Sequence, residues 1–249
     1  EIMSSDWSSD VCSSDLIYYQ GQNRAVDPRI VPARELYSRY DELASTGDFK
    51  AVFLLLDTIE QIYLSYPHYD SSFELGVLDN NRGAALLTLA LHRDSIPGAS
   101  DPFPTLSADS LVSLARHHLE NAISTYTDWQ STYQGLSQSA LKKTVSEDFW
   151  EGWDPGAERE PRMVQKRAAE IGSALGECPR RLSVCYSNLG LTHRLSGEYE
   201  TAVSHYLHAL ELWDRNLEAE NNLNRILNQP LKKRNFIQKL FPPSKNNGS

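Results

Sequence analysis

Small residues at fixed places in one helical hairpin constrain this chain more than any other feature of its sequence. The 34 residues from Ser183 to Asn216 carry apolar side chains at spacings of three and four, with one interruption at Gly197. This pattern predicts two helices joined by a short turn, with the glycine at the end of the first helix, where a positive φ is favoured. Gly190 and Ala202 stand where the two helices are expected to come closest. Such a hairpin cannot bury its own apolar faces, so we expect it to stack on others.

This hairpin resembles a tetratricopeptide repeat (TPR). Two weaker copies of the pattern lie upstream, one around Gly47-Asp48-Phe49 and one around Asn81-Arg82-Gly83. The resemblance implies an all-α fold of stacked antiparallel helical hairpins, a TPR-like α-solenoid with inserted loops and a C-terminal capping helix. The residues that match the family's large, small and aromatic positions are Tyr186, Leu189, Gly190, His193, Gly197, Tyr199, Ala202, Tyr206 and Ala209, whereas Asp214 replaces the usual proline.

The same resemblance divides residues 17–228 into parts. It implies repeat units at about 33–66, 75–123 and 183–216, an insert at 124–175 and a capping helix at 216–228. The proline-rich residues 94–107 are expected to be a loop. Proline at the first helical turn predicts one helix from Pro161 to Leu175 and a second that begins at Pro179. Leucine and alanine outnumber valine and isoleucine, which favours helix over sheet.

The first 16 residues are expected to be foreign to the protein. Residues 6–16 read DWSSDVCSSDL, which resembles the translation of a common short-read sequencing adapter. We therefore expect residues 1–16 to be a disordered, non-native segment, in which Cys12 carries no chemistry. The alternative is a disordered N-terminus rich in serine and aspartate. If the authentic start is missing, the sequence leaves the compartment open between the cytoplasm and the cell envelope.

Charge and composition argue against several classes of function. A formal net charge of −9 argues against a nucleic-acid-binding protein, and three cysteines are too few for a disulfide scaffold. Glycine-rich phosphate loops and the motifs of metalloproteases and serine hydrolases are absent from the sequence. We therefore predict no enzyme, no catalytic, cofactor-binding or metal-binding residues and no cofactor. The sequence does not specify an oligomeric state.

The resemblance implies a non-catalytic module or scaffold that binds a peptide or protein segment in the concave face of the array. Asparagine recurs at one repeat position, in Asn81, Asn188 and Asn222. A side-chain amide both donates and accepts, which suits a peptide backbone, although it also suits a bond to an adjacent helix. The side chains of Arg34, Arg194 and Arg225 are suited to bind a carboxylate of that segment through charge-assisted hydrogen bonds. The candidate groove residues are Arg34, Tyr37, Asn81, Ser187, Asn188, Leu191, Arg194, Asn222 and Arg225. Because Tyr37 stands where the family's clamp lysine is expected, we predict no specific terminal-carboxylate clamp.

Two histidine pairs, a cysteine pair and an aromatic segment are considered as further candidate sites. His205 and His208 stand three residues apart, a spacing that can share a metal ion, and His117 and His118 are adjacent. A metal ion bound by either pair would make the chain a metal-binding protein or an enzyme, a hypothesis that the sequence supports less than the interaction module. Cys178 and Cys185 are seven residues apart, and Cys185 is expected to pack between helices. The aromatic segment 147–155 is either a plug packed on the array or an exposed recognition loop.

The C-terminal residues 229–249 form a basic tail on an otherwise acidic chain. Within residues 231–241, Phe236, Ile237, Leu240 and Phe241 are expected on one helical face, with Lys232, Lys233, Arg234 and Lys239 supplying positive charge. Such a helix can lie on an anionic membrane surface, which gives the alternative function of a membrane-peripheral adaptor. The other interpretation is a short helix docked on the acidic array, or a frayed end.

Overall fold

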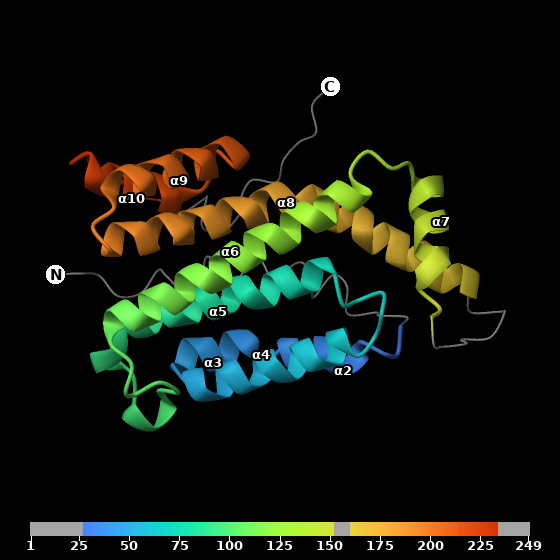
Figure 1. Ribbon diagram of the computed structural model, residues 1–249, viewed down its shortest axis with the longest axis horizontal. Coiled ribbons are helices and arrows are strands. Elements are labelled where there is room, and N and C mark those ends of the chain that lie inside the picture. Colours follow the sequence, from blue (N-terminus) through green and yellow to red (C-terminus); the bar gives the residue numbers. More distant parts are fainter. Residues whose placement is uncertain (1–26, 152–159, 234–249) are drawn as a thin grey trace.

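Every regular element in the residues that the computed structural model describes, 27–151 and 160–233, is a helix (Figure 1). The all-α class predicted from the sequence is confirmed. The helices are α2 (Val31–Tyr37), α3 (Tyr40–Thr46), α4 (Phe49–Leu64), α5 (Phe73–His92), α6 (Ala108–Tyr133), α7 (Gln138–Asp148), α8 (Glu160–Leu195), α9 (Tyr199–Leu212) and α10 (Leu217–Ile226), with short 3-10 helices η1 (Arg93–Ser95) and η2 (Gly98–Ser100). Successive groups of helices pack side by side, from α2, α3 and α4 through α5 and α6 to α8, and then to α9 and α10 (Figure 1). Helix α7 stands crosswise against α8.

Two helix ends share one turn geometry. Gly47 ends α3 with a φ of 73°, and Gly197 follows α8 with a φ of 79°. At each turn the glycine N–H donates to the carbonyl three residues back, at 3.2 Å and 3.1 Å, and the next N–H donates to the carbonyl five residues back, at 3.1 Å and 2.9 Å. This pair of bonds is the Schellman motif, which needs a residue in the left-handed region. The glycine turns predicted for the first and third units are therefore confirmed.

Glycine also permits close packing between neighbouring helices. A Cβ atom on Gly190 would lie 2.6 Å from Cε1 of Tyr206 in α9, and one on Gly83 would lie 2.7 Å from Cγ of Leu119 in α6. Ala202 is completely buried. The close crossing predicted at Gly190 is confirmed, and Ala202, the other small residue predicted there, is buried. The pair α5 and α6 makes the same kind of contact as the pair α8 and α9, so the two pairs are built alike.

The helix boundary predicted at Pro179 is wrong. We expected one helix to end at Leu175 and another to begin at Pro179, but α8 is a single helix of 36 residues with Pro179 inside it. An internal proline removes one backbone hydrogen bond and costs about 3 kcal/mol. Cys178 and Leu182, on either side of it, are both buried in the core. Tertiary packing of both flanks keeps the helix continuous in spite of the proline.

Two other boundaries also differ from the expectation. The helical pattern that begins at Pro32 is divided, because α2 ends at Tyr37 and α3 begins at Tyr40. Helix α6 continues to Tyr133, although the second unit was expected to end at residue 123. Tyr126 and Trp129 are buried, so the apolar stripe of α6 extends two further turns into the predicted insert.

The hydrophobic core extends through most of the described chain. One cluster of buried residues runs from α2 to α8, and a second, smaller cluster joins α9 to α10. Phe149, in the aromatic segment, is 1% exposed and packs edge-on against His68 at 4.9 Å between ring centroids. Trp150 packs against the larger cluster. The plug interpretation is therefore confirmed for these two aromatics, whereas residues 152–155 lie outside the described residues, as do 1–16.

Candidate functional site

The predicted groove residues are mostly buried. Arg194 is half-buried and Arg225 is exposed. The other seven are between 0% and 7% exposed: Arg34, Tyr37, Asn81, Ser187, Asn188, Leu191 and Asn222. These seven residues therefore contribute to packing inside the protein rather than to an open surface.

Arg34, the first of them, already holds a carboxylate. Its guanidinium donates to both oxygens of Glu170, from Nη1 at 3.2 Å and from Nη2 at 2.9 Å. Paired parallel bonds of this kind are the strong mode by which arginine recognises a carboxylate. The two residues are 136 positions apart in the sequence. The carboxylate partner predicted for Arg34 is thus supplied by α8 of the same chain.

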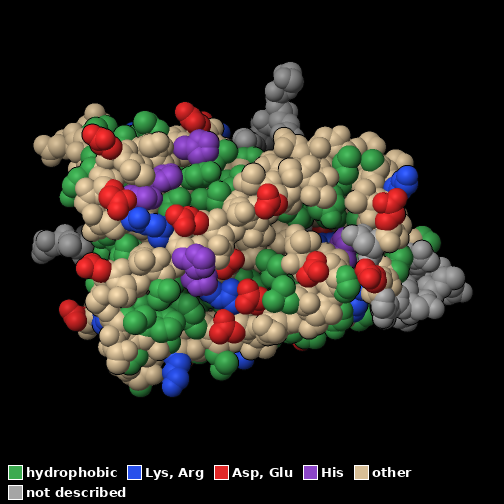
Figure 2. Space-filling view, in the orientation of Figure 1, with side chains coloured by type: hydrophobic (Ala, Val, Ile, Leu, Met, Phe, Trp, Pro, Cys, Tyr) green, Lys and Arg blue, Asp and Glu red, His purple; other side chains and the backbone are tan. Residues whose placement is uncertain are grey.

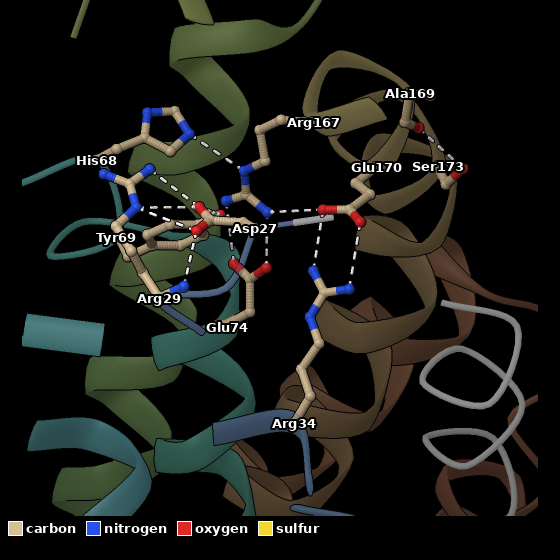
Figure 3. A network of polar contacts seen from close by, with 10 residues as sticks. All are labelled: Asp27, Arg29, Arg34, His68, Tyr69, Glu74, Arg167, Ala169, Glu170 and Ser173. Carbon is tan, nitrogen blue, oxygen red and sulfur yellow. Dashed lines mark hydrogen bonds and ion pairs between the residues drawn. The ribbon is translucent and has the colours of Figure 1, made fainter. Parts of the chain in front are cut away.

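The Arg34–Glu170 pair is part of a larger buried set of charges, which we call the α8 network (Figure 3). Arg167 lies between two carboxylates: it donates to Glu74 of α5 at 2.8 Å and lies 3.5 Å from Glu170. Its Nε donates to Nε2 of His68 at 3.1 Å. Its guanidinium also stacks over the Tyr69 ring at 4.6 Å from the centroid. The network joins α2, α5 and the α4–α5 turn to the first half of α8.

Burial alone would disfavour every charge in this network. It would raise the pKa of Glu74, but the guanidinium groups of Arg167 and Arg34 and a backbone hydrogen bond together lower that pKa to about 2. Burial would lower the pKa values of Arg34 and Arg167, yet the carboxylates of Glu170 and Glu74 raise them. A buried charge with its partner in place is stable, and one without it is costly. The network therefore fixes the first half of α8 in one position.

A cavity of about 10 Å³ adjoins the α8 network and is lined in part by Arg34, Arg167 and Glu170. This volume corresponds to a single water molecule, whereas sites for small organic ligands enclose roughly 300–1,000 Å³. The cavity is too small to bind a substrate, so the network does not form a small-molecule site in this conformation.

Two of the three predicted asparagines, Asn81 and Asn222, have hydrogen-bond partners inside the described part of the protein. Asn81 donates to the Tyr37 hydroxyl at 2.8 Å, which joins α5 to α2. Asn222 accepts from Nη1 of Arg225 at 2.8 Å, within α10. The Asn81 bond matches the structural alternative, in which the amide bonds to an adjacent helix, whereas the Asn222 bond stays within its own helix.

Two asparagines that the sequence reasoning missed do bind the backbone of a non-helical segment. The Asn221 amide donates to the Lys232 carbonyl at 3.0 Å, and its oxygen accepts from the Lys232 N–H at 2.8 Å. Asn224 donates to the Pro230 carbonyl at 3.3 Å. The Lys232 ammonium forms an ion pair with Glu220. The signal that would have found this site is the spacing of three residues between Asn221 and Asn224, in the helix that precedes Pro230.

These bonds place the described start of the basic tail, residues 230–233, along α10. The rest of the predicted membrane segment, residues 234–241, lies outside the described residues. Among the helices that the structure describes, none combines the length and the apolar character required to cross a membrane.

Histidine side chains gather with acidic side chains on the face formed by α6, α8 and α9 (Figure 2). The His193 ring stacks on His205 at 4.9 Å, and the Tyr186 ring contacts both His205 and His208, at 5.8 Å and 4.4 Å. Burial, followed by the neighbouring His193, His208 and Arg116, lowers the pKa of His205. His205 and His208 are thus both engaged by Tyr186.

The other pair of histidines is divided between two partners. His118 pairs with Asp79 at 2.8 Å, whereas His117 faces Asn121 at 3.4 Å. Within residues 27–151 and 160–233, no three or more histidine, cysteine, aspartate or glutamate side chains are grouped so that they could hold a metal ion.

Comparison with known proteins adds no family to this description. No protein-family model matches the chain, and neither the curated proteins nor the solved structures include one that is significantly similar to it.

Proposed function

We propose that the protein is a non-catalytic interaction module, a TPR-like array of helix pairs that holds a segment of another protein along α10. The repeated helix pairs support this proposal. The turns at Gly47 and Gly197 have the same hydrogen bonds, and Gly83 and Gly190 make equivalent close contacts. Repeated pairs of this kind generate extended faces that suit peptide binding.

The observation that carries the proposal is the pair of bonds between Asn221 and Lys232. Asn221 contacts both main-chain polar groups of Lys232, at 2.8 Å and 3.0 Å. Recognition of this kind depends on backbone conformation and not on the side chain, as when an extended peptide pairs with an exposed strand. We infer that a partner segment binds α10 in the same way, in exchange for residues 230–232. Arg225 is exposed on the same helix and is suited to pair with an acidic side chain of the partner.

A peptide library tests this function. A random library displayed on phage is panned against the immobilised full chain, and the enriched peptides are synthesised with a fluorescent label. We expect an enriched peptide to bind Asn221→Ala at least tenfold more weakly than the unmodified chain, because two main-chain hydrogen bonds are lost. Asn121→Ala is the matched control, since Asn121 is an exposed asparagine on α6. The proposal is overturned if no peptide is enriched, or if Asn221→Ala and Asn121→Ala bind the enriched peptide equally well.

A further inference from the structure

We propose that α10 selects partner segments that carry a lysine or an arginine where this chain has Lys232, and that Glu220 is the residue that makes this selection. The inference rests on the function proposed above and deepens it, because it names the class of segment that the α10 site takes. Residues 230–232 of the chain itself are the segment that the structure shows at this site.

The turn after α10 directs the chain back along the helix. Asn228 has a φ of 55°, in the left-handed region, and among the described residues other than glycine it alone has a positive φ. The Gln229 N–H donates to the Asn224 carbonyl, five residues back, at 2.8 Å, as in the Schellman motif. Pro230 then prevents the helix from continuing. The residues that follow therefore run antiparallel to α10, from Asn224 towards Asn221.

Two buried amides hold the backbone of this segment. Asn221 and Asn224 are 9% and 8% exposed and stand three residues apart on α10. Asn224 donates to the carbonyl of Pro230 at 3.3 Å, and Asn221 bonds to the N–H and the carbonyl of Lys232, at 2.8 Å and 3.0 Å. Leu231, between these two residues, is 48% exposed. The amide bonds thus fix the register of the segment without distinguishing one side chain from another.

This register brings the Lys232 side chain to an acidic residue of α10. The Lys232 ammonium forms an ion pair with Glu220, the residue next to Asn221. The Glu220 side chain is 29% exposed and the Lys232 side chain is 63% exposed, so the pair is partly open to solvent and adds little affinity. A partner carboxylate at the same place would face Glu220 and be repelled by it. The pair therefore contributes selectivity for a basic side chain more than strength of binding.

The charge of the whole chain favours the same class of partner. The formal net charge is −9, and Glu218 and Glu220 both lie in the first turn of α10. An acidic surface attracts basic segments before they make contact and repels acidic ones. The segment at the site belongs to the basic tail, residues 229–249. A partner segment with similar charge would be steered to α10 in the same way.

An exchange of charges within the full chain tests the role of Glu220. The measurement is the protection of the backbone N–H of residue 232 against exchange with water, followed by NMR, because this N–H donates to Asn221. We expect Glu220→Lys to reduce the protection about fivefold, since it places two ammonium groups together. The double variant Glu220→Lys/Lys232→Glu should restore it, which a loss of the α10 fold would not allow.

Glu200→Lys is the control for this experiment, because it makes the same change of charge at an exposed residue of α9. It should leave the protection of residue 232 as in the unmodified chain. Unchanged protection in Glu220→Lys, or no recovery in the double variant, overturns the role assigned to Glu220.

The peptide library described above tests the partner class. The library is panned in parallel against the unmodified chain and against Glu220→Lys. We expect the peptides enriched on the unmodified chain to share a lysine or arginine at one position, and those enriched on the variant to share an aspartate or glutamate there. Replacing the shared basic residue by glutamate should weaken binding to the unmodified chain about fivefold and strengthen binding to Glu220→Lys.

The two proposals fail in different ways. Enriched peptides that depend on Asn221 but carry the same residues on both chains overturn the selection by Glu220 and leave the proposed function standing. A library without any enriched peptide overturns the proposed function, and with it the partner class. The protection of residue 232 still decides whether Glu220 holds the basic side chain.

Discussion

Gly190 of α8 lies against the ring of Tyr206 of α9 so closely that no side chain fits between the two helices. Added to Gly190, a Cβ would come within 3.1 Å of three ring atoms of a fully buried tyrosine. The ring has no free space to move into, because Tyr206 also forms the small cluster that joins α9 to α10. This contact fixes the separation of the pair and leads to the first prediction.

Gly190→Ala should destabilise the protein, and Gly176→Ala should not. Overpacking of a buried helix contact costs typically 1–3 kcal/mol, and we expect about that loss for Gly190→Ala. Gly176 has open space around its Cα, so alanine there should raise stability by roughly 0.5–1 kcal/mol through its better helix propensity. Urea denaturation of both variants measures the difference. Equal midpoints for the two variants would show that Tyr206 does not limit the crossing.

Acid should weaken the α8 network through Glu74. The folded-state pKa of Glu74, about 2, lies below its ordinary value of 4.5, so its contribution is fully present above pH 4.5 and is lost as the pH falls towards 2. This contribution is on the order of 3 kcal/mol. We expect the unfolding free energy of the unmodified chain to fall more steeply in this range than that of Glu74→Gln. Parallel pH profiles for the two chains would contradict the assignment.

Mild acid should act through His205. Its pKa is lowered by burial and by His193, His208 and Arg116, so the unfolded chain binds this proton more readily than the folded chain. Stability should therefore decrease as the pH falls through the ordinary histidine value of 6.5. We expect His205→Gln to reduce this decrease, measured as the urea midpoint on either side of that pH. His92→Gln, at the exposed end of α5, should leave the decrease unchanged. A decrease that is identical in all three chains would exclude His205 as its origin.

The two described cysteines should be unreactive until the protein unfolds. Burial raises the pKa of the Cys178 thiol to about 12 and raises that of Cys185 as well. Cys185 also donates to the Asn80 side-chain oxygen at 3.3 Å. A Cys12→Ser chain isolates these two thiols. We expect no reaction with an aromatic disulfide reagent under native conditions and reaction of both thiols in concentrated guanidinium chloride. Rapid native labelling of either thiol would show that the core opens locally around α8.

Much of the local structure was predictable because it depends on neighbouring residues. The helices follow from apolar spacing, and the turns at Gly47 and Gly197 follow from the left-handed backbone that glycine tolerates. The close approach at Gly190 follows from its lack of a side chain. The break at Pro179 was predicted wrongly because propensity describes an isolated helix, whereas buried residues on both sides hold this one together.

The candidate site was predicted only in part. Arg34 was expected in a groove for a partner's carboxylate, and in the structure it is buried against Glu170 of the same chain, 136 positions away. The asparagines that bind the backbone of residues 230–232 are Asn221 and Asn224, which were not predicted, whereas the predicted Asn222 pairs with Arg225. Which side of a short helix faces a returning segment depends on the path of that segment, which the periodicity of the helix does not contain.

The sequence by itself determined that the chain forms helices, where two of its turns lie and which small residues let the helices approach. These are short-range properties, set by side-chain volume, backbone conformation and spacing. Only the tertiary structure decided that the first half of α8 covers Arg34 and Glu74 and that residues 230–232 lie along α10. Those contacts join distant parts of the chain, and their stability comes from burying matched charges and backbone groups together, which no local pattern specifies.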